Sequence, residues 1–267
     1  MTSRQLPLLI PAAPVYDEAS FLEAASNEDA RTWLSRTEIW PERRLALFGD
    51  ADRGKTHLSR IWAARTAAEV LDGPSLSGFP DISTVAGVAI DDADRADEAA
   101  LLHLLNAARE LGRPVLLAAR MAPAHWNVRL RDLASRLRAI TAVEISAPDD
   151  DLLRRLLIHF LAQRRLVADE ALHSRLLLKL PRSPDVLRAA VARLDREALT
   201  SRRRSVTPAM VRQALDSLVD SPGDSLGDSP GDSPGKFIEA SLAEGDVQAK
   251  FSSERHDAPS PMKDQPE

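Results

Sequence analysis

Cysteine is absent from this 267-residue sequence, which also has a single tyrosine and only 4% aromatic residues. The absence excludes disulfides, thiol nucleophiles and thiolate metal ligands. Six histidines are present, but none of them shows the short spacing of a metal-binding pair. We therefore expect any metal to arrive with a bound ligand rather than in a site of its own.

Long apolar runs are also missing. No stretch approaches the roughly 18 uncharged residues that a membrane helix needs, and the opening "MTSRQLPLLIPAAP" lacks the pattern of a signal peptide. These features predict a cytoplasmic protein without membrane contact. The formal net charge of −5 argues against bulk nucleic acid as the main ligand.

Apolar runs and helical stretches alternate over the first half of the chain. After a proline-punctuated entry segment, residues 1–20, helical spacing begins at Phe21 and continues to Arg36. The runs "LALFG", "VAGVAI", "PVLLAA" and "AVEIS" are typical of strands, and "HLSRIWAARTAAEVL" and "AALLHLLNAAREL" are typical of helices. Strands separated by helices predict an α/β domain with a parallel sheet, which we assign to residues 21–148.

The pattern changes after "APDDD". Residues 149–219 contain only amphipathic helical stretches, and Ser183 and Thr207 each precede a proline, as N-cap residues do. We expect a small all-helical domain there. Residues 220–267 begin with a repeat of Asp, Ser, Pro and Gly that has little to bury, so we expect an acidic, disordered tail.

One motif carries phosphate chemistry. Gly49, Gly54, Lys55 and Thr56 satisfy G-x-x-x-x-G-K-[ST] between an expected strand and an expected helix. In such a P-loop the backbone N–H groups cradle phosphates, the lysine neutralises their charge and the threonine hydroxyl ligates Mg²⁺. A glycine-rich turn without a ligand is the alternative, but the flanking elements favour a site for ATP or ADP.

A second strand, "VAGVAIDDAD", ends in two acidic residues. Asp91 stands where a P-loop protein needs a carboxylate for Mg²⁺, and Asp92 stands where a carboxylate can polarise the attacking water. The alternative is the ordinary preference of a helix N-terminus for acidic residues. Together with the P-loop, the pair favours nucleotide chemistry.

The order of these motifs resembles that of the AAA+ ATPases related to the replication initiator DnaA. The P-loop, "IDDAD", "RDLASRLRA" and "SPDVLRAAVARLD" carry the resemblance, which spans residues 5–218. More narrowly the chain is similar to the Hda family of DnaA inactivators. The resemblance implies an AAA+ domain with a parallel sheet, followed by a helical lid.

Two arginines gain roles from this resemblance. Arg136, in "ASRL", matches the arginine finger that reaches the nucleotide of a neighbouring subunit, and Arg188, in "DVLRAAV", matches the lid arginine that contacts the chain's own nucleotide. On spacing alone an ordinary surface arginine is the more common interpretation of either residue. The resemblance also leaves a homo-oligomer possible.

The start of the chain resembles a partner-binding peptide. "QLPLLI" is similar to the peptides by which the Hda family docks on the DNA polymerase sliding clamp, with Gln5 at the pocket rim and Leu6, Leu8 and Leu9 as apolar anchors. A strand that covers the protein's own core is the alternative. The resemblance implies contact with DNA only through the clamp.

Two departures from the family pattern weaken the case for vigorous hydrolysis. Asp52 and Arg53 replace small residues of the loop, and Ala119 stands where a polar residue is expected. Either Asp52 turns outward and pairs with Arg53, or its charge lowers nucleotide affinity. We expect a nucleotide-bound regulator that stimulates ATP hydrolysis by DnaA, acting through Arg136. A self-sufficient ATPase such as a helicase loader, and a scaffold with a vestigial site, are the alternatives.

The region after the expected lid excludes one further role. The Asp-Ser-Pro-Gly repeat has neither the bulk nor the positive charge of a helix-turn-helix domain that fills a major groove. We therefore do not expect this chain to act as an origin-binding initiator.

Overall fold

The structure is a computed structural model, and it describes residues 16, 18–201 and 203–219. The predicted docking residues Gln5, Leu6, Leu8 and Leu9 lie outside the described residues, as does the predicted tail, 220–267.

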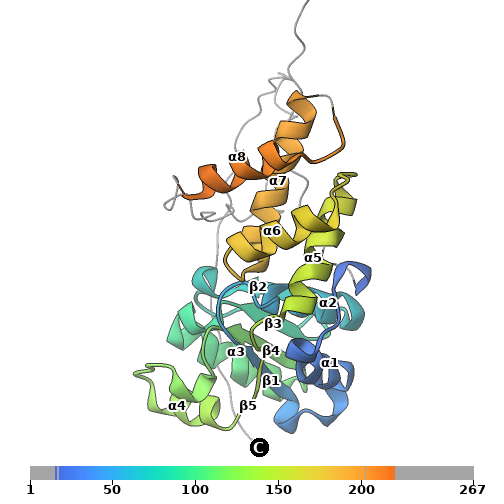
Figure 1. Cartoon of the computed structure of the whole chain (residues 1–267). Helices are drawn as coiled ribbons and strands as arrows, with labels where there is room; N and C mark the ends of the chain where they lie inside the picture. The colour runs from blue at the N-terminus through green and yellow to red at the C-terminus, as the bar shows by residue number, and fades with distance from the viewer. Residues whose placement is uncertain (1–15, 17, 202, 220–267) are drawn as a thin grey trace, which may run out of the picture. The chain divides into compact units, whose positions relative to one another are not determined.

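Five parallel strands form the sheet, in the order β2-β3-β4-β1-β5 (Figure 1). Their bounds are β1 Arg44–Phe48, β2 Glu69–Asp72, β3 Val88–Asp91, β4 Val115–Ala119 and β5 Thr141–Glu144. Phe48 at the end of β1 is opposite Ala119 on one neighbour and Glu144 on the other, so these three strands end together. The order places β1 inside the sheet, and a ligand site is expected at the carboxyl ends of such strands.

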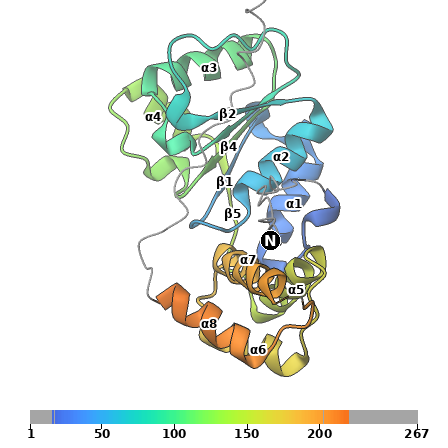
Figure 2. The same ribbon diagram turned by 90° about the horizontal axis from the view of Figure 1, so that it is seen from above.

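Helices cover both faces of the sheet, and Figure 2 shows the resulting three layers. On one side lie α1, Glu28–Ser35, and α2, Lys55–Thr66; on the other lie α3, Glu98–Glu110, and α4, Arg131–Arg138. Strand side chains alternate between the two layers: Leu45 and Leu47 pack with α1 and α2, and Ala46 between them packs with α3 and α4. The predicted α/β domain with a parallel sheet is confirmed.

Two local predictions differ from the structure. The helix expected over residues 21–36 is only α1, because residues 25–27 form a 3₁₀ turn before it. The run "HLSRIWAARTAAEVL" is typical of one helix, but α2 ends at Thr66 because Ala67 adopts a left-handed conformation with φ of +54°. Residues 69–72 then form strand β2, which pairs in parallel with β3. Spacing in the sequence does not reveal this partner strand.

Short 3₁₀ turns join several elements of this part. They are η1 Glu18–Ser20, η2 Ala25–Asn27, η3 Thr37–Ile39, η4 Pro41–Arg43, η5 Gly73–Ser75, η6 Ala93–Arg95 and η7 Pro123–His125. The turns η5 and η6 contact each other next to the end of β3 and therefore bear on the site described below.

Four helices form the lid: α5 Asp150–Gln163, α6 Glu170–Lys179, α7 Pro184–Thr200 and α8 Pro208–Val219 (Figure 2). They share their own hydrophobic core, in which Leu157, Leu176 and Leu194 are fully buried. The predicted N-caps are confirmed: the Ser183 hydroxyl accepts from Val186 N, and the Thr207 hydroxyl accepts from Met210 N. Within the described part of the chain, no helix is long and apolar enough to span a membrane.

Candidate functional site

The P-loop connects β1 to α2 and depends on its two glycines. Gly49 has φ of +150° and Gly54 has φ of +89°, conformations that side-chain-bearing residues rarely adopt. A Cβ on Gly49 would also lie 2.6 Å from the carbonyl oxygen of Ile145. Both predicted glycines are therefore required by the backbone path of the loop.

Lys55 is buried at the first position of α2. Its Nζ donates hydrogen bonds to the carbonyl oxygens of Gly49 and Asp50, each at 2.7 Å. Burial lowers the pKa of the Lys55 ammonium, and the nearby carboxylates of Asp91 and Asp92 oppose that effect. A cation held at the centre of the loop suits the neutralisation of phosphate charge.

Thr56 and Asp91 lie 35 positions apart in the sequence but meet in the structure. The Thr56 hydroxyl donates to the Asp91 carboxylate at 2.6 Å. Burial raises the pKa of Asp91, while the hydrogen bond from Thr56 favours its ionised form. A hydroxyl and a carboxylate in contact are the oxygen ligands that Mg²⁺ uses beside nucleotide phosphates, so these two residues fit the predicted metal.

The start of α2 fits phosphates as well. In the described residues no side chain caps this helix, whose N-cap is Gly54. The first N–H groups of a helix have no intrahelical acceptor, and the helix dipole favours an anion at that end. The loop and α2 thus provide backbone donors beside Lys55 and Thr56. When bound there, Mg²⁺ would supply charge neutralisation between the phosphate oxygens.

Asp92 follows Asp91 in a tight turn. It has φ of +48°, and its carboxylate pairs with Arg95 at 3.4 Å. The turn leaves no space beside it: a Cβ on Gly73 would lie 2.2 Å from the carbonyl oxygen of Asp92. Gly73 therefore sets how closely η5 approaches the end of β3 and where the two aspartates stand.

The two departures in the sequence have different outcomes. Arg53 pairs with Asp50 at 3.2 Å and not with Asp52, so of the two alternatives for Asp52 the one in which it pairs with Arg53 is wrong. Asp52 instead accepts a hydrogen bond at 2.9 Å from the hydroxyl of Ser183, the N-cap of lid helix α7. The lid therefore lies close enough to the P-loop to hydrogen-bond Asp52. The sequence could not indicate this contact, because the two residues are 131 positions apart.

Ala119 is fully buried in β4 and has no polar function, but the exposed Arg120 follows it directly. Repulsion from Arg120 contributes to the lowered pKa of Lys55, so a second cation stands near the loop. Sequence analysis missed this residue, although a basic residue at the end of a predicted strand was the available signal.

Arg120 also lines a cavity of about 330 Å³ beside the P-loop, at the ends of β1, β4 and β5. Its polar lining residues are Asp50, Arg53, Arg120, His125 and Glu144. The mixture of charges differs from the backbone donors of the P-loop itself. The cavity extends the polar region around the loop toward β5.

The two predicted arginines lie in different surroundings. Arg188, on α7, donates to Asp185 and lies over the ring of Phe160, 5.2 Å from its centroid. It is therefore on the side of the lid that meets the P-loop through Asp52. Arg136, on α4, pairs with Asp132 of its own helix at 3.1 Å. The structure thus brings Arg188 to the loop region and leaves Arg136 on a helix that packs against α3 and η7.

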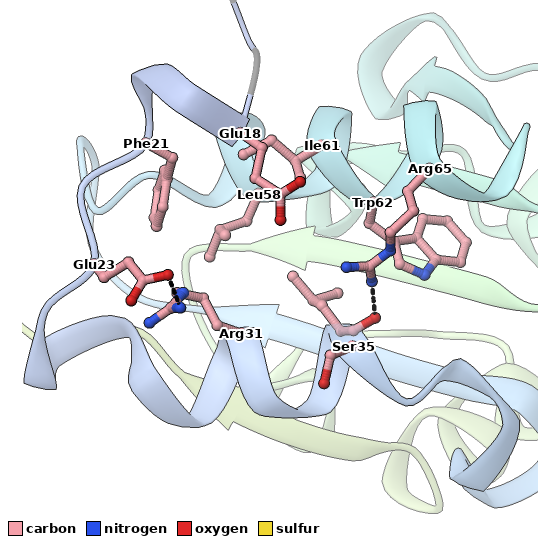
Figure 3. A pocket seen from close by; sticks show the side chains of 10 residues that line it. Glu18, Phe21, Glu23, Arg31, Ser35, Leu58, Ile61, Trp62 and Arg65 are labelled. Atoms are coloured by element: carbon pink, nitrogen blue, oxygen red, sulfur yellow. Dashed lines mark hydrogen bonds and ion pairs between the residues drawn. The ribbon is translucent and has the colours of Figure 1, made fainter.

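A second cavity lies between the first described residues, α1 and α2 (Figure 3). Its volume is about 120 Å³, and Leu58 and Trp62 of α2 form part of its apolar wall. The two arginines at its edge are occupied, since Arg31 pairs with Glu23 and Arg65 donates to the carbonyl of Leu34. The residues that line this cavity do not include those of the P-loop.

Comparisons with known proteins rest on structure alone. The sequence matches no family model, and no curated protein is similar to it in sequence. Domain III of the replication initiation protein DnaA from Thermotoga maritima superposes with a TM-score of 0.66 at 16% identity, covering 78% of this chain and 98% of that one.

Two further solved structures share the fold. AMPPCP-bound DnaA from Aquifex aeolicus has a TM-score of 0.58 at 16% identity, covering 71% of this chain and 70% of that one. The RuvB Holliday junction branch migration motor of Thermotoga maritima has a TM-score of 0.58 at 16% identity, covering 72% and 69%. This chain therefore has an AAA+ fold, a P-loop α/β domain followed by a helical lid. Within that class its fold is DnaA-like.

Proposed function

We propose that this chain is a nucleotide-bound regulator of replication initiation, of the kind that the Hda family represents. In this proposal it binds ADP or ATP with Mg²⁺ through Lys55, Thr56 and Asp91. It docks on the DNA-loaded sliding clamp through residues 5–9 and stimulates ATP hydrolysis by the initiator DnaA through Arg136. The initiator then passes to its ADP form and cannot start a second round.

The observation that carries this proposal is the placement of Arg136. Leu133 and Leu137 anchor α4 in the core, which holds the helix rigid. Arg131 and Arg138 are exposed on the same helix and, with Arg136, outnumber the exposed Asp132, so α4 carries a net positive charge. A net positive charge on a rigid helix is suited to a partner that carries phosphate charge, and an arginine finger is useful only when it is held in place.

The test compares two arginines of α4. The rate at which DnaA-bound ATP becomes ADP is measured with clamp loaded on DNA and with the native chain, Arg136→Ala or Arg138→Ala. Arg136→Ala should abolish the stimulation, because a finger in trans contributes roughly 10³ to 10⁵ in rate. Arg138→Ala removes the same charge from the same helix but leaves the proposed finger in place, so it should retain most of the stimulation. Full stimulation by Arg136→Ala would refute the finger.

Clamp docking has its own test. Leu8→Ala combined with Leu9→Ala removes two apolar anchors of the proposed peptide and should abolish binding to the isolated clamp. Nucleotide binding by the same variant should be unchanged, which separates docking from folding. Unchanged clamp binding would place the docking surface elsewhere on the chain.

A self-sufficient ATPase, such as a helicase loader, is the second candidate. The contact between Thr56 and Asp91 favours it, because the pair of Mg²⁺ ligands that hydrolysis requires is complete in this chain. Asp92 would then polarise the attacking water. Steady-state turnover by the chain alone, lost in Lys55→Ala and Asp91→Asn, would support this candidate over the regulator.

A further inference from the structure

Asp52 is a residue of the P-loop that is bonded to the lid. It has φ of +64°, a left-handed conformation that aspartate tolerates better than most residues. Its carboxylate accepts the hydrogen bond from Ser183 at the start of α7. Arg53 is already paired with Asp50, so the charge of Asp52 is directed toward the lid rather than its own loop.

A second carboxyl meets Asp52 at this point. Asp185 lies in the first turn of α7, two residues after Ser183, and is close enough to Asp52 that each carboxyl shifts the pKa of the other. Two ionised carboxylates have no proton to donate, so a hydrogen bond between them requires one proton shared by the pair. The charged groups that face the pair are Arg188, which donates to Asp185, and Lys55 of α2.

The ionisation of the two carboxyls differs accordingly. Burial, followed by the hydrogen bond to Asp52, raises the pKa of Asp185 to about 6. Burial also opposes the charge of Asp52, but hydrogen bonds from Asp185 and Ser183 prevail and lower its pKa. Because the two groups titrate as a pair, the shared proton is held up to about pH 6 and is lost above it.

We propose that Asp52 and Asp185 form a proton-dependent latch between the P-loop and the lid, and that nucleotide phosphates compete with this latch for Arg188. Arg188 is the only cation that an ion pair ties to Asp185 in the described residues. When phosphates draw Arg188 away, Asp185 loses its counter-charge and holds its proton more tightly. Nucleotide binding is then coupled to proton uptake, and affinity decreases as pH rises.

The size of this coupling follows from the titration of one group. A rise of about one pH unit in the pKa of Asp185 on binding makes Mg·ADP affinity about fivefold higher near pH 6 than near pH 8. Saturating Mg²⁺ keeps the nucleotide itself ionised over this range. The second half of the proposal rests on the proposed nucleotide binding; the latch itself does not.

The first experiment measures Mg·ADP affinity of the full chain at both pH values by calorimetry, in two buffers of different ionisation enthalpy. Native protein should take up a fraction of a proton and lose about fivefold in affinity. Asp185→Asn should show neither effect, and Asp150→Asn, which removes an exposed carboxylate of α5, should behave as native. Equal pH dependence in native protein and Asp185→Asn would overturn the competition.

A second experiment tests the latch without nucleotide. Carboxyl carbon-13 NMR of the nucleotide-free chain should show one aspartate titrating near pH 6, and Asp52→Asn should return it to the ordinary range. A high titration that persists in Asp52→Asn would overturn the pair. Failure of the native chain to bind Mg·ADP at any pH, with this titration intact, would refute the proposed function and the competition while supporting the latch.

Discussion

Replacing Asp185 by asparagine should stabilise the nucleotide-free protein at neutral pH, although it removes an ion pair. The asparagine amide donates a hydrogen bond to Asp52 at every pH, as the Asp185 carboxyl does only when it is protonated. Arg188 loses its partner, but that pair is half-exposed and contributes little. The relief of two facing carboxylates is therefore the larger effect.

The sign and size follow from the pKa of Asp185, which lies at about 6 in the folded protein and 3.8 ordinarily. Between these values the folded state holds more protons than the unfolded state, so native stability falls as pH rises through this window. At about 1.36 kcal/mol per pH unit the upper bound is about 3 kcal/mol. Because the side chain is 35% exposed, solvent screening reduces this to about 1 kcal/mol.

Urea unfolding followed by circular dichroism from about pH 4 to about pH 8 measures this effect. Helix signal is preferable to fluorescence, because the four tryptophans precede the lid helices in the chain. Asp185→Asn should match native protein at the acidic end and exceed it by about 1 kcal/mol above about pH 6.5. Asp150→Asn is the matched control. If the unfolding free energies of Asp185→Asn and native protein differ by the same amount at every pH in this range, the reasoning is refuted.

Four further substitutions test the packing and charge of the site and the packing of the lid. Gly73→Ala should cost about 1–3 kcal/mol in urea unfolding and weaken Mg·ADP binding, because its Cβ would meet the carbonyl of Asp92 at 2.2 Å. Gly78→Ala, where φ is +65° and no atom lies within 4 Å, should cost about 1–2 kcal/mol and leave binding intact; equal binding losses would contradict this contrast. Arg120→Ala should weaken Mg·ATP more than Mg·ADP in equilibrium titrations, since a second cation favours the more negative ligand; an equal loss would argue against it. Leu194→Ala, fully buried in the lid, should cost about 2–5 kcal/mol by circular dichroism, and a smaller loss would mean that the lid core repacks.

Sequence spacing predicted most of the elements because their signals are local. The strands around Leu47 and Leu117 are short apolar runs, and the caps at Ser183 and Thr207 precede prolines in the chain. Strand β2 was missed because its residues continue a helical pattern without a break. Only the neighbouring β3 and the left-handed Ala67 decide that the chain becomes extended there.

The candidate site divides in the same way. The P-loop and the pair Asp91–Asp92 are contiguous motifs, so the sequence was sufficient to find them. Asp52 was recognised as unusual, but Arg53, the partner considered for it, is not the one it has, since Ser183 lies 131 positions away in the sequence. Arg120 was overlooked because the expected polar position was one residue earlier.

By itself the sequence determined the α/β class, the helical lid and the place of the P-loop motif between a strand and a helix. Each of these depends on spacing within one element or across one turn, where geometry is fixed by the backbone. The tertiary structure decided that Thr56 meets Asp91, that Gly73 presses against Asp92 and that Asp52 is hydrogen-bonded to Ser183 of the lid. Those contacts join elements far apart in the chain, and only the packing of strands and helices brings them together.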